Sequence, residues 1–168
     1  MGSHIQAWHN LFFPNLVLTL VQLDELFTRV RMTASAAWRW LAFDPVSKPI
    51  PSLHLGGRTK NDAFALVHDF QLRLLPNCIP PTTTDGLLSY FYALTAHFGA
   101  CDLPTARSHH WQPSADLHYG QLVKRKGKRN ATITHTRMLW GKRYELFARL
   151  REAELRPLIQ TAFVQPST

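Results

Sequence analysis

Cysteine is scarce in this 168-residue chain. Its two cysteines, Cys78 and Cys101, stand 23 positions apart, and neither belongs to a C-x-x-C element. This usage indicates neither a zinc knuckle nor a disulfide framework. We therefore expect a protein of a reducing compartment, and predict a cytoplasmic location.

Long apolar runs are missing as well. The longest apolar stretch, 11–26, is interrupted by Pro14, Asn15, Gln22, Asp24 and Glu25, whereas a membrane-spanning helix needs about 20 apolar residues. The N-terminal residues show no basic segment followed by an apolar run and a small-residue cleavage site, so no signal peptide is predicted. No internal repeat is visible either, which argues against a solenoid.

Acidic residues are few, with 11 Asp and Glu against 19 Lys and Arg, and the formal charge is +8. Because 45% of the residues are hydrophobic and 11% aromatic, a disordered basic tail is excluded and one folded domain is expected. A folded basic protein favours a polyanionic partner, either nucleic acid or an anionic membrane surface. A basic surface without such a partner stays open as the alternative.

The pattern of apolar residues predicts strands first and then strands alternating with helices. Strands are expected over 16–30, 38–43, 50–55, 81–84, 119–124 and 131–139. Helices are expected from Thr59 or Asn61 to just before Pro76, over 87–97 and over 142–154. Residues 100–113 lack periodicity and are expected to form a loop, with room for a short strand. This order predicts an α/β protein with a mixed sheet flanked by helices.

Two aspartates stand in unusual places. Asp24 interrupts an apolar strand, and Asp85 lies between a short strand and a helix, where open α/β sheets bind ligands. Two carboxylates brought together repel each other unless a cation neutralises them, and Mg²⁺ with oxygen ligands is the natural choice. The alternative for Asp85 is an ordinary N-cap at the entry to the helix.

Six short segments occur in an order that belongs to a known family. They are LDEL (23–26), GGRTKNDAFAL (56–66), TTDGLLSYFYAL (83–94), HFG (97–99), YGQLVKRKGKR (119–129) and TAFV (161–164). Together they resemble the small bacterial insertion-element transposases of the DDE class. The resemblance implies an RNase H-like, integrase-type catalytic domain over 17–168, after an N-terminal extension over 1–16. Its expected architecture has three layers, with a mixed five-stranded sheet flanked by helices.

The same resemblance assigns roles to three positions. Asp24 in D-E-L and Asp85 in T-D-G match the first and second catalytic acids, and both are expected to bind Mg²⁺ or Mn²⁺. The third acid of the family is a Glu directly after the T-A-F-V segment, where this chain has Gln165. A glutamine offers a neutral carbonyl and cannot supply the charge that holds cations in two-metal phosphoryl transfer.

The expected function is therefore metal-dependent DNA strand cleavage and transfer during transposition, by a catalytic domain that is inactive or strongly impaired. A non-catalytic DNA-binding remnant of a transposase is the alternative. The chain ends three residues after Gln165, and only 23 residues precede Asp24, so we expect a form truncated at both ends. Expected partners are DNA, both element ends and target, and a second copy or an intact transposase, with the protein associated with the nucleoid.

Basic residues concentrate around Gly127, an expected hairpin tip. The five cations are Lys124, Arg125, Lys126, Lys128 and Arg129. Contact with DNA phosphates is the functional interpretation, and a solvated turn is the alternative. Gln121 and Lys124 are the best candidates near the active face. Arg58, in the G-R-T segment, is expected either to bind a phosphate or to pair with an acid.

Other candidates carry less weight. A zinc cluster of His109, His110, Asp116 and His118 is disfavoured because no helical i, i+4 histidine pair exists. Trp38 and Trp40 alternate on one strand and are expected in the core.

Overall fold

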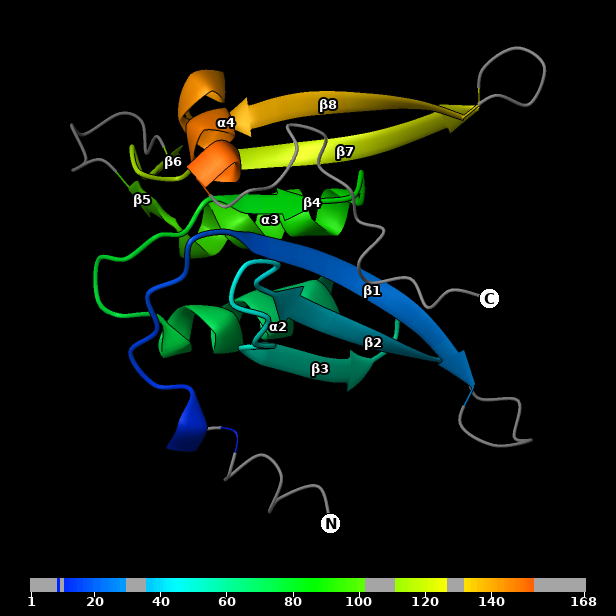
Figure 1. Cartoon of the computed structure of the whole chain (residues 1–168). Coiled ribbons are helices and arrows are strands. Elements are labelled where there is room, and N and C mark those ends of the chain that lie inside the picture. Colours follow the sequence, from blue (N-terminus) through cyan, green and yellow to red (C-terminus); the bar gives the residue numbers. More distant parts are fainter. Residues whose placement is uncertain (1–8, 10, 30–35, 102–110, 127–131, 153–168) are drawn as a thin grey trace, which may run out of the picture.

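A six-stranded mixed sheet forms the centre of the protein (Figure 1). The computed structural model describes residues 9, 11–29, 36–101, 111–126 and 132–152. The strands, in spatial order, are β3 (Ser52–Gly56), β2 (Ala36–Phe43), β1 (Val21–Arg29), β4 (Thr82–Thr84), β7 (Tyr119–Lys126) and β8 (Thr132–Trp140). The predicted α/β class with a mixed sheet is confirmed. The expected number of five strands is wrong, because β8 folds back on β7 and adds a sixth.

Strand directions divide the sheet into two parts. The first three strands form an antiparallel meander, in which β2 pairs with both β1 and β3. Next to it, β1, β4 and β7 run parallel to one another. Leu23 of β1 pairs with Thr84, the last residue of β4, so the carboxyl end of β4 lies beside the middle of β1, which continues to Arg29.

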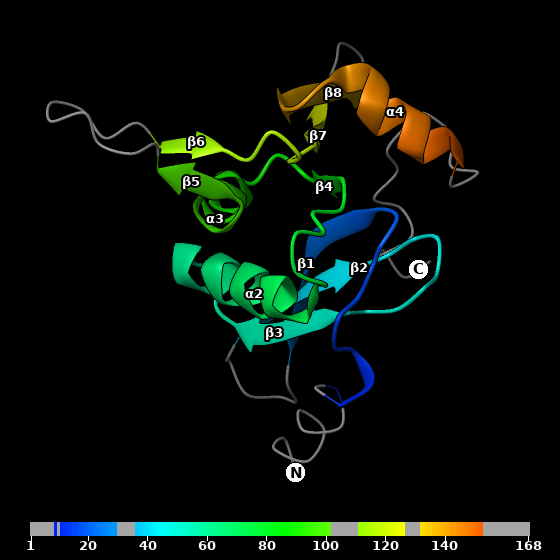
Figure 2. The same cartoon turned by 90° about the vertical axis from the view of Figure 1, so that its left-hand side faces the viewer.

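In the part of the chain that the structure describes, helices cover both faces of this sheet (Figure 2). They are α2 (Lys60–Arg73), α3 (Leu88–His97) and α4 (Arg143–Glu152). The first two share one face, where α2 buries apolar residues at three- and four-residue spacing against the sheet. The third packs on the opposite face, where Leu146 meets Leu20 and Leu122. None of the helices within the described ranges is long and apolar enough to cross a membrane.

The main core lies between the sheet and the pair α2 and α3. Its largest fully buried side chains include Trp40, Tyr90, Tyr119 and Phe70. Side chains of β7 serve both faces, since Tyr119 belongs to this cluster and Leu122 to the cluster under α4. This alternation of side chains along a strand lets one sheet support two helical layers.

Two predicted segments differ from the structure. The strand expected from residue 16 begins only at Val21, and Leu16 instead forms an isolated bridge with Leu74. The segment expected as a loop supplies a two-stranded sheet of β5 (Gly99–Cys101) and β6 (Trp111–Pro113). These strands are too short for a period to show in the sequence.

Candidate functional site

A cavity of about 460 Å³ opens at the carboxyl end of β4, beside the middle of β1. Segments far apart in the chain line it, through Asp24, Arg58, Asp85, Gly86, Leu87, Leu122 and Val123. Strand register explains why the two aspartates meet. Leu23 of β1 pairs with Thr84 of β4, so the next residue of each strand, Asp24 and Asp85, emerges at the same level of the sheet.

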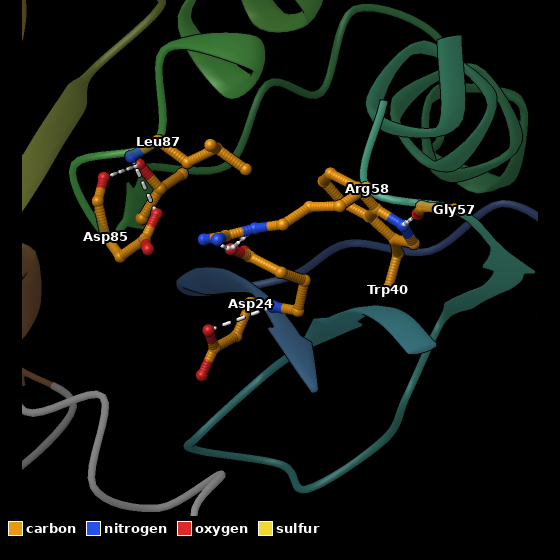
Figure 3. Close-up of polar contacts among 8 residues, drawn as sticks. Asp24, Trp40, Gly57, Arg58, Asp85 and Leu87 are labelled. Carbon is orange, nitrogen blue, oxygen red and sulfur yellow. Dashed lines mark hydrogen bonds and ion pairs between the residues drawn. The ribbon is translucent and has the colours of Figure 1, made fainter. Parts of the chain in front are cut away.

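Main-chain amides orient both aspartates (Figure 3). Oδ1 of Asp24 accepts the N–H of Glu25 at 2.9 Å, and Oδ1 of Asp85 accepts the N–H of Leu87 at 2.8 Å. The second bond closes an Asx turn just before α3. The N-cap residue of α3 is Leu87, which has no side-chain cap bond. The N-cap alternative for Asp85 is therefore wrong, because its side chain bonds the turn before the helix.

A third carboxylate, that of Glu25, lies behind the cavity in a buried ion pair. Its Oε1 accepts hydrogen bonds from Nη2 of Arg58 at 2.6 Å and from Nε at 3.2 Å. The Glu25 side chain is 2% exposed and that of Arg58 is 46% exposed. Burial and the nearby Asp85 charge raise the pKa of Glu25, and the bonds from Arg58 only partly offset them. Arg58 thus pairs with an acid, one of the two expected roles.

The G-G-R-T segment holds the backbone around Arg58. Nε1 of Trp40 donates to the carbonyl of Gly57 at 2.8 Å. On the other side, Thr59 is the N-cap of α2 and forms a capping box with Asp62. Contacts on both sides of Arg58 therefore fix the path of its main chain.

Gly56 makes close packing possible in that segment. A Cβ added there would stand 2.0 Å from Oδ1 of Asp62 and 2.9 Å from Nε2 of His54. Those two side chains bond each other at 2.9 Å. Burial raises the pKa of Asp62, but bonds from Thr59 and His54 lower it by more, so the net shift is downward.

A chain of buried hydroxyls supports the backbone at Asp85. Nε2 of Gln121 donates to Oη of Tyr119 at 2.8 Å, Tyr119 bonds Oγ1 of Thr84 at 2.9 Å, and Thr84 donates to the Asp85 carbonyl at 2.7 Å. Burial raises the pKa of Tyr119 to about 12, with a smaller contribution from the Asp85 charge. Gln121 is only 5% exposed, so its amide serves this interior chain and not a surface that faces DNA.

The remaining predicted residues fall into two groups. The backbone of Lys124, Arg125 and Lys126 forms the end of β7. Lys128, Arg129, Gln165, His109 and His110 lie outside the described residues. His118 forms an ion pair with Glu145 at 2.7 Å, and Asp116 is exposed. The two residues therefore do not form a metal cluster together.

Glu25 and Tyr90 were not anticipated from the sequence. Tyr90 is fully buried against Trp40, with ring centroids 5.4 Å apart. Burial and the charges of Glu25, Asp24 and Asp85 raise its pKa well above the usual value, so the phenol stays neutral. Strand alternation was the available signal, since Glu25 follows Leu23 by two positions and must share its core-facing side.

The aspartate pair is suited to one hard cation. Mg²⁺ is commonly bound through one or two carboxylates and completes its shell with water, and the cavity offers two carboxylates with room beside them. Within the ranges that the structure describes, no group of three or more His, Cys, Asp or Glu side chains could hold a metal ion. A scan against protein-family models gives no match for this chain, and a search of curated proteins gives none.

Proposed function

We propose that the chain is the catalytic domain of a DDE-class insertion-element transposase, with an RNase H-like fold, acting on DNA by metal-dependent phosphoryl transfer. The observation that carries the proposal is the register of β1 and β4. It brings Asp24 and Asp85, 61 positions apart in the sequence, to one cavity at the carboxyl end of β4, beside the middle of β1. Such an edge is the usual ligand site of an α/β sheet.

The segments that carry the family resemblance support the same proposal. Four of them, L-D-E-L, G-G-R-T, T-T-D-G-L and Y-G-Q-L-V, each contribute a residue to the lining of this cavity. The order β1-β2-β3-α2-β4-α3 is also the order that the resemblance implies. The charge of +8 suits a polyanionic substrate.

In the proposed reaction, Asp24 and Asp85 hold Mg²⁺ or Mn²⁺ at the cavity. When bound, the cation supplies positive charge for the attacking and leaving oxygens of a phosphodiester. The chain's own task is to fix two carboxylates, which the turn at Asp85 and the strand at Asp24 perform. Because Gln165 stands where the family has its third acid, we propose that activity is strongly impaired.

A plasmid-nicking assay tests this function. Supercoiled DNA incubated with Mn²⁺ or Mg²⁺ should be nicked weakly by the chain, and Asp85→Asn should abolish the nicking. Asp116→Asn, which changes an exposed carboxylate outside the cavity, is the matched control and should have no effect. Gln165→Glu should raise the rate if this position supplies the third ligand. Nicking that persists in Asp85→Asn would overturn the proposal.

A DNA-binding protein without catalysis is the second candidate. It is favoured by the finding that no group of three or more potential metal ligands occurs in the described ranges. Isothermal titration calorimetry with Mn²⁺ separates the two. Binding that disappears in Asp85→Asn supports the enzyme, whereas DNA binding without any Asp85-dependent cation binding supports the second candidate.

A further inference from the structure

Arg58 is held more firmly than its exposure suggests. Two of its nitrogens, Nε and Nη2, bond the same oxygen of Glu25. Its guanidinium also lies over the Trp38 ring, 4.6 Å from the ring centroid. A surface arginine normally keeps most of its rotamer freedom, but here an ion pair and a cation–π contact restrict one half-exposed side chain from two directions.

Glu25 is poorly placed to act directly on a ligand. Its side chain is almost fully buried and does not line the cavity. Its Oε1 is used by Arg58, and within the described residues its Oε2 makes no hydrogen bond. A carboxylate kept ionised in such a place is costly to bury, so its clearest effect is to fix the guanidinium.

The bonds to Glu25 use two of the three guanidinium nitrogens, which leaves the third for a ligand. Within the described residues, Nη1 of Arg58 donates no hydrogen bond, and the side chain lines the cavity together with Asp24 and Asp85. In Figure 3 the Asp85 carboxylate faces the end of the Arg58 side chain, whereas the Asp24 carboxylate points away from them. One wall of the cavity is thus anionic and suited to a cation, and the other presents a fixed N–H donor suited to an anion.

We propose that Arg58 binds a non-bridging phosphate oxygen of the nucleic-acid strand at this cavity, and that Glu25 and Trp38 are positioning residues for it. The inference rests on the proposed function, because it takes DNA as the ligand. It adds that the phosphate lies between the cation side and the arginine side of the cavity. A planar guanidinium, held through two of its nitrogens, is the side chain best suited to such an orientation.

The test measures the affinity of a short fluorescein-labelled DNA duplex by anisotropy, in Ca²⁺ so that binding is separated from cleavage, over a series of salt concentrations. Four variants are compared with the unchanged chain: Arg58→Lys, Glu25→Gln, the double variant Glu25→Gln/Arg58→Gln, and the control Lys48→Gln. The double variant replaces the buried pair with two neutral amides, which avoids an unpaired buried carboxylate. Lys48 lies in the turn between β2 and β3, outside the cavity lining.

The double variant should bind DNA about ten-fold more weakly than Glu25→Gln. The slope of log affinity against log salt concentration should also be smaller, by about one released counterion. Arg58→Lys should keep the slope and lose affinity several-fold, since the single nitrogen of an ammonium cannot bond Glu25 through one end of a planar group while presenting a second nitrogen to the cavity. Lys48→Gln should change affinity less than two-fold. Circular dichroism checks that each variant is folded.

Glu25→Gln gives the sharpest result. A pure effect of net charge and a positioning role of Glu25 predict opposite changes in DNA affinity. Removing a negative charge strengthens DNA binding if only net charge matters, but weakens it if Glu25 positions Arg58. Stronger binding in Glu25→Gln, or equal binding by Glu25→Gln and the double variant, overturns the inference. If the unchanged chain binds no DNA even at low salt, the proposed function fails instead.

Discussion

Two kinds of carboxylate meet at the cavity, and they are held in different ways. Asp24 and Asp85 are oriented by main-chain N–H groups and line the open space. Glu25, next to Asp24 in the sequence, is buried and bound to a guanidinium. The same chemical group therefore lines the proposed ligand site in the two aspartates and forms a buried structural contact in Glu25.

Because the two kinds of carboxylate are held differently, their substitution should affect different properties of the protein. Neutralising Glu25's partner leaves a buried charge without compensation, which costs folding free energy. Neutralising an aspartate of the cavity removes repulsion between neighbouring carboxylates and need not cost stability. Substitutions on the two sides should consequently change different measurements.

The largest effect is expected for Arg58→Gln. Loss of the cation leaves Glu25 buried and unpaired, so the free energy of unfolding should fall by about 2–4 kcal/mol, less than for a fully buried pair because Arg58 is partly exposed. Urea denaturation followed by circular dichroism measures this change. Adding Glu25→Gln should restore most of the loss, and a double variant as unstable as Arg58→Gln would contradict the pairing.

The next largest effect is expected for Gly56→Ala, which disturbs the segment that carries Arg58. In Gly56→Ala the new methyl group would stand 2.0 Å from Oδ1 of Asp62, so the bond between Asp62 and His54 or the capping box must give way. We expect a loss of about 1–3 kcal/mol in the free energy of unfolding, typical of overpacking. Gly57→Ala is the matched control, since a Cβ there would have no neighbour closer than 3.5 Å.

The sequence predicted one side of the cavity well. An aspartate in an apolar strand and another at a strand–helix junction were enough to single out Asp24 and Asp85, and the parallel register explains why they meet. The helices were predicted because their buried residues recur at three- and four-residue spacing, as in α2.

The other side of the cavity depends on contacts that no pattern in the sequence specifies. Glu25 and Arg58 are 33 positions apart, and their pairing requires the turn after β3 to bring the G-R-T segment over β1. Gln121 was expected to face DNA, but its neighbour in the hydrogen-bond chain, Tyr119, holds it inside the sheet. Periodicity indicates which face a residue occupies, but it does not identify the partner on that face.

A smaller effect is expected behind the aspartates, at Tyr119. Its pKa of about 12 lies above the usual 10.0, so the neutral phenol is favoured by the folded state. This contribution to stability is complete below pH 10 and is lost as the pH rises toward 12. Tyr119→Phe should lower the free energy of unfolding by about 1 kcal/mol at neutral pH and reduce the loss between pH 10 and 12. Urea midpoints measured across that range would show an unchanged alkaline loss if Tyr119 were not responsible.

The smallest change in stability, and the clearest change in function, is expected for Asp85→Asn. An asparagine keeps the oxygen that accepts the Leu87 N–H, so the turn before α3 should survive, while the charge that raises the pKa of Glu25 disappears. The free energy of unfolding should therefore stay within about 0.5 kcal/mol of the original value or increase slightly, and calorimetric binding of Mn²⁺ should be lost. Asp85→Ala provides the contrast, because it removes charge and turn together and should cost about 1 kcal/mol more. If Asp85→Asn were as destabilising as Arg58→Gln, the aspartates would belong to the structural side of the cavity, and the division between a cation-binding pair and a stabilising ion pair would fail.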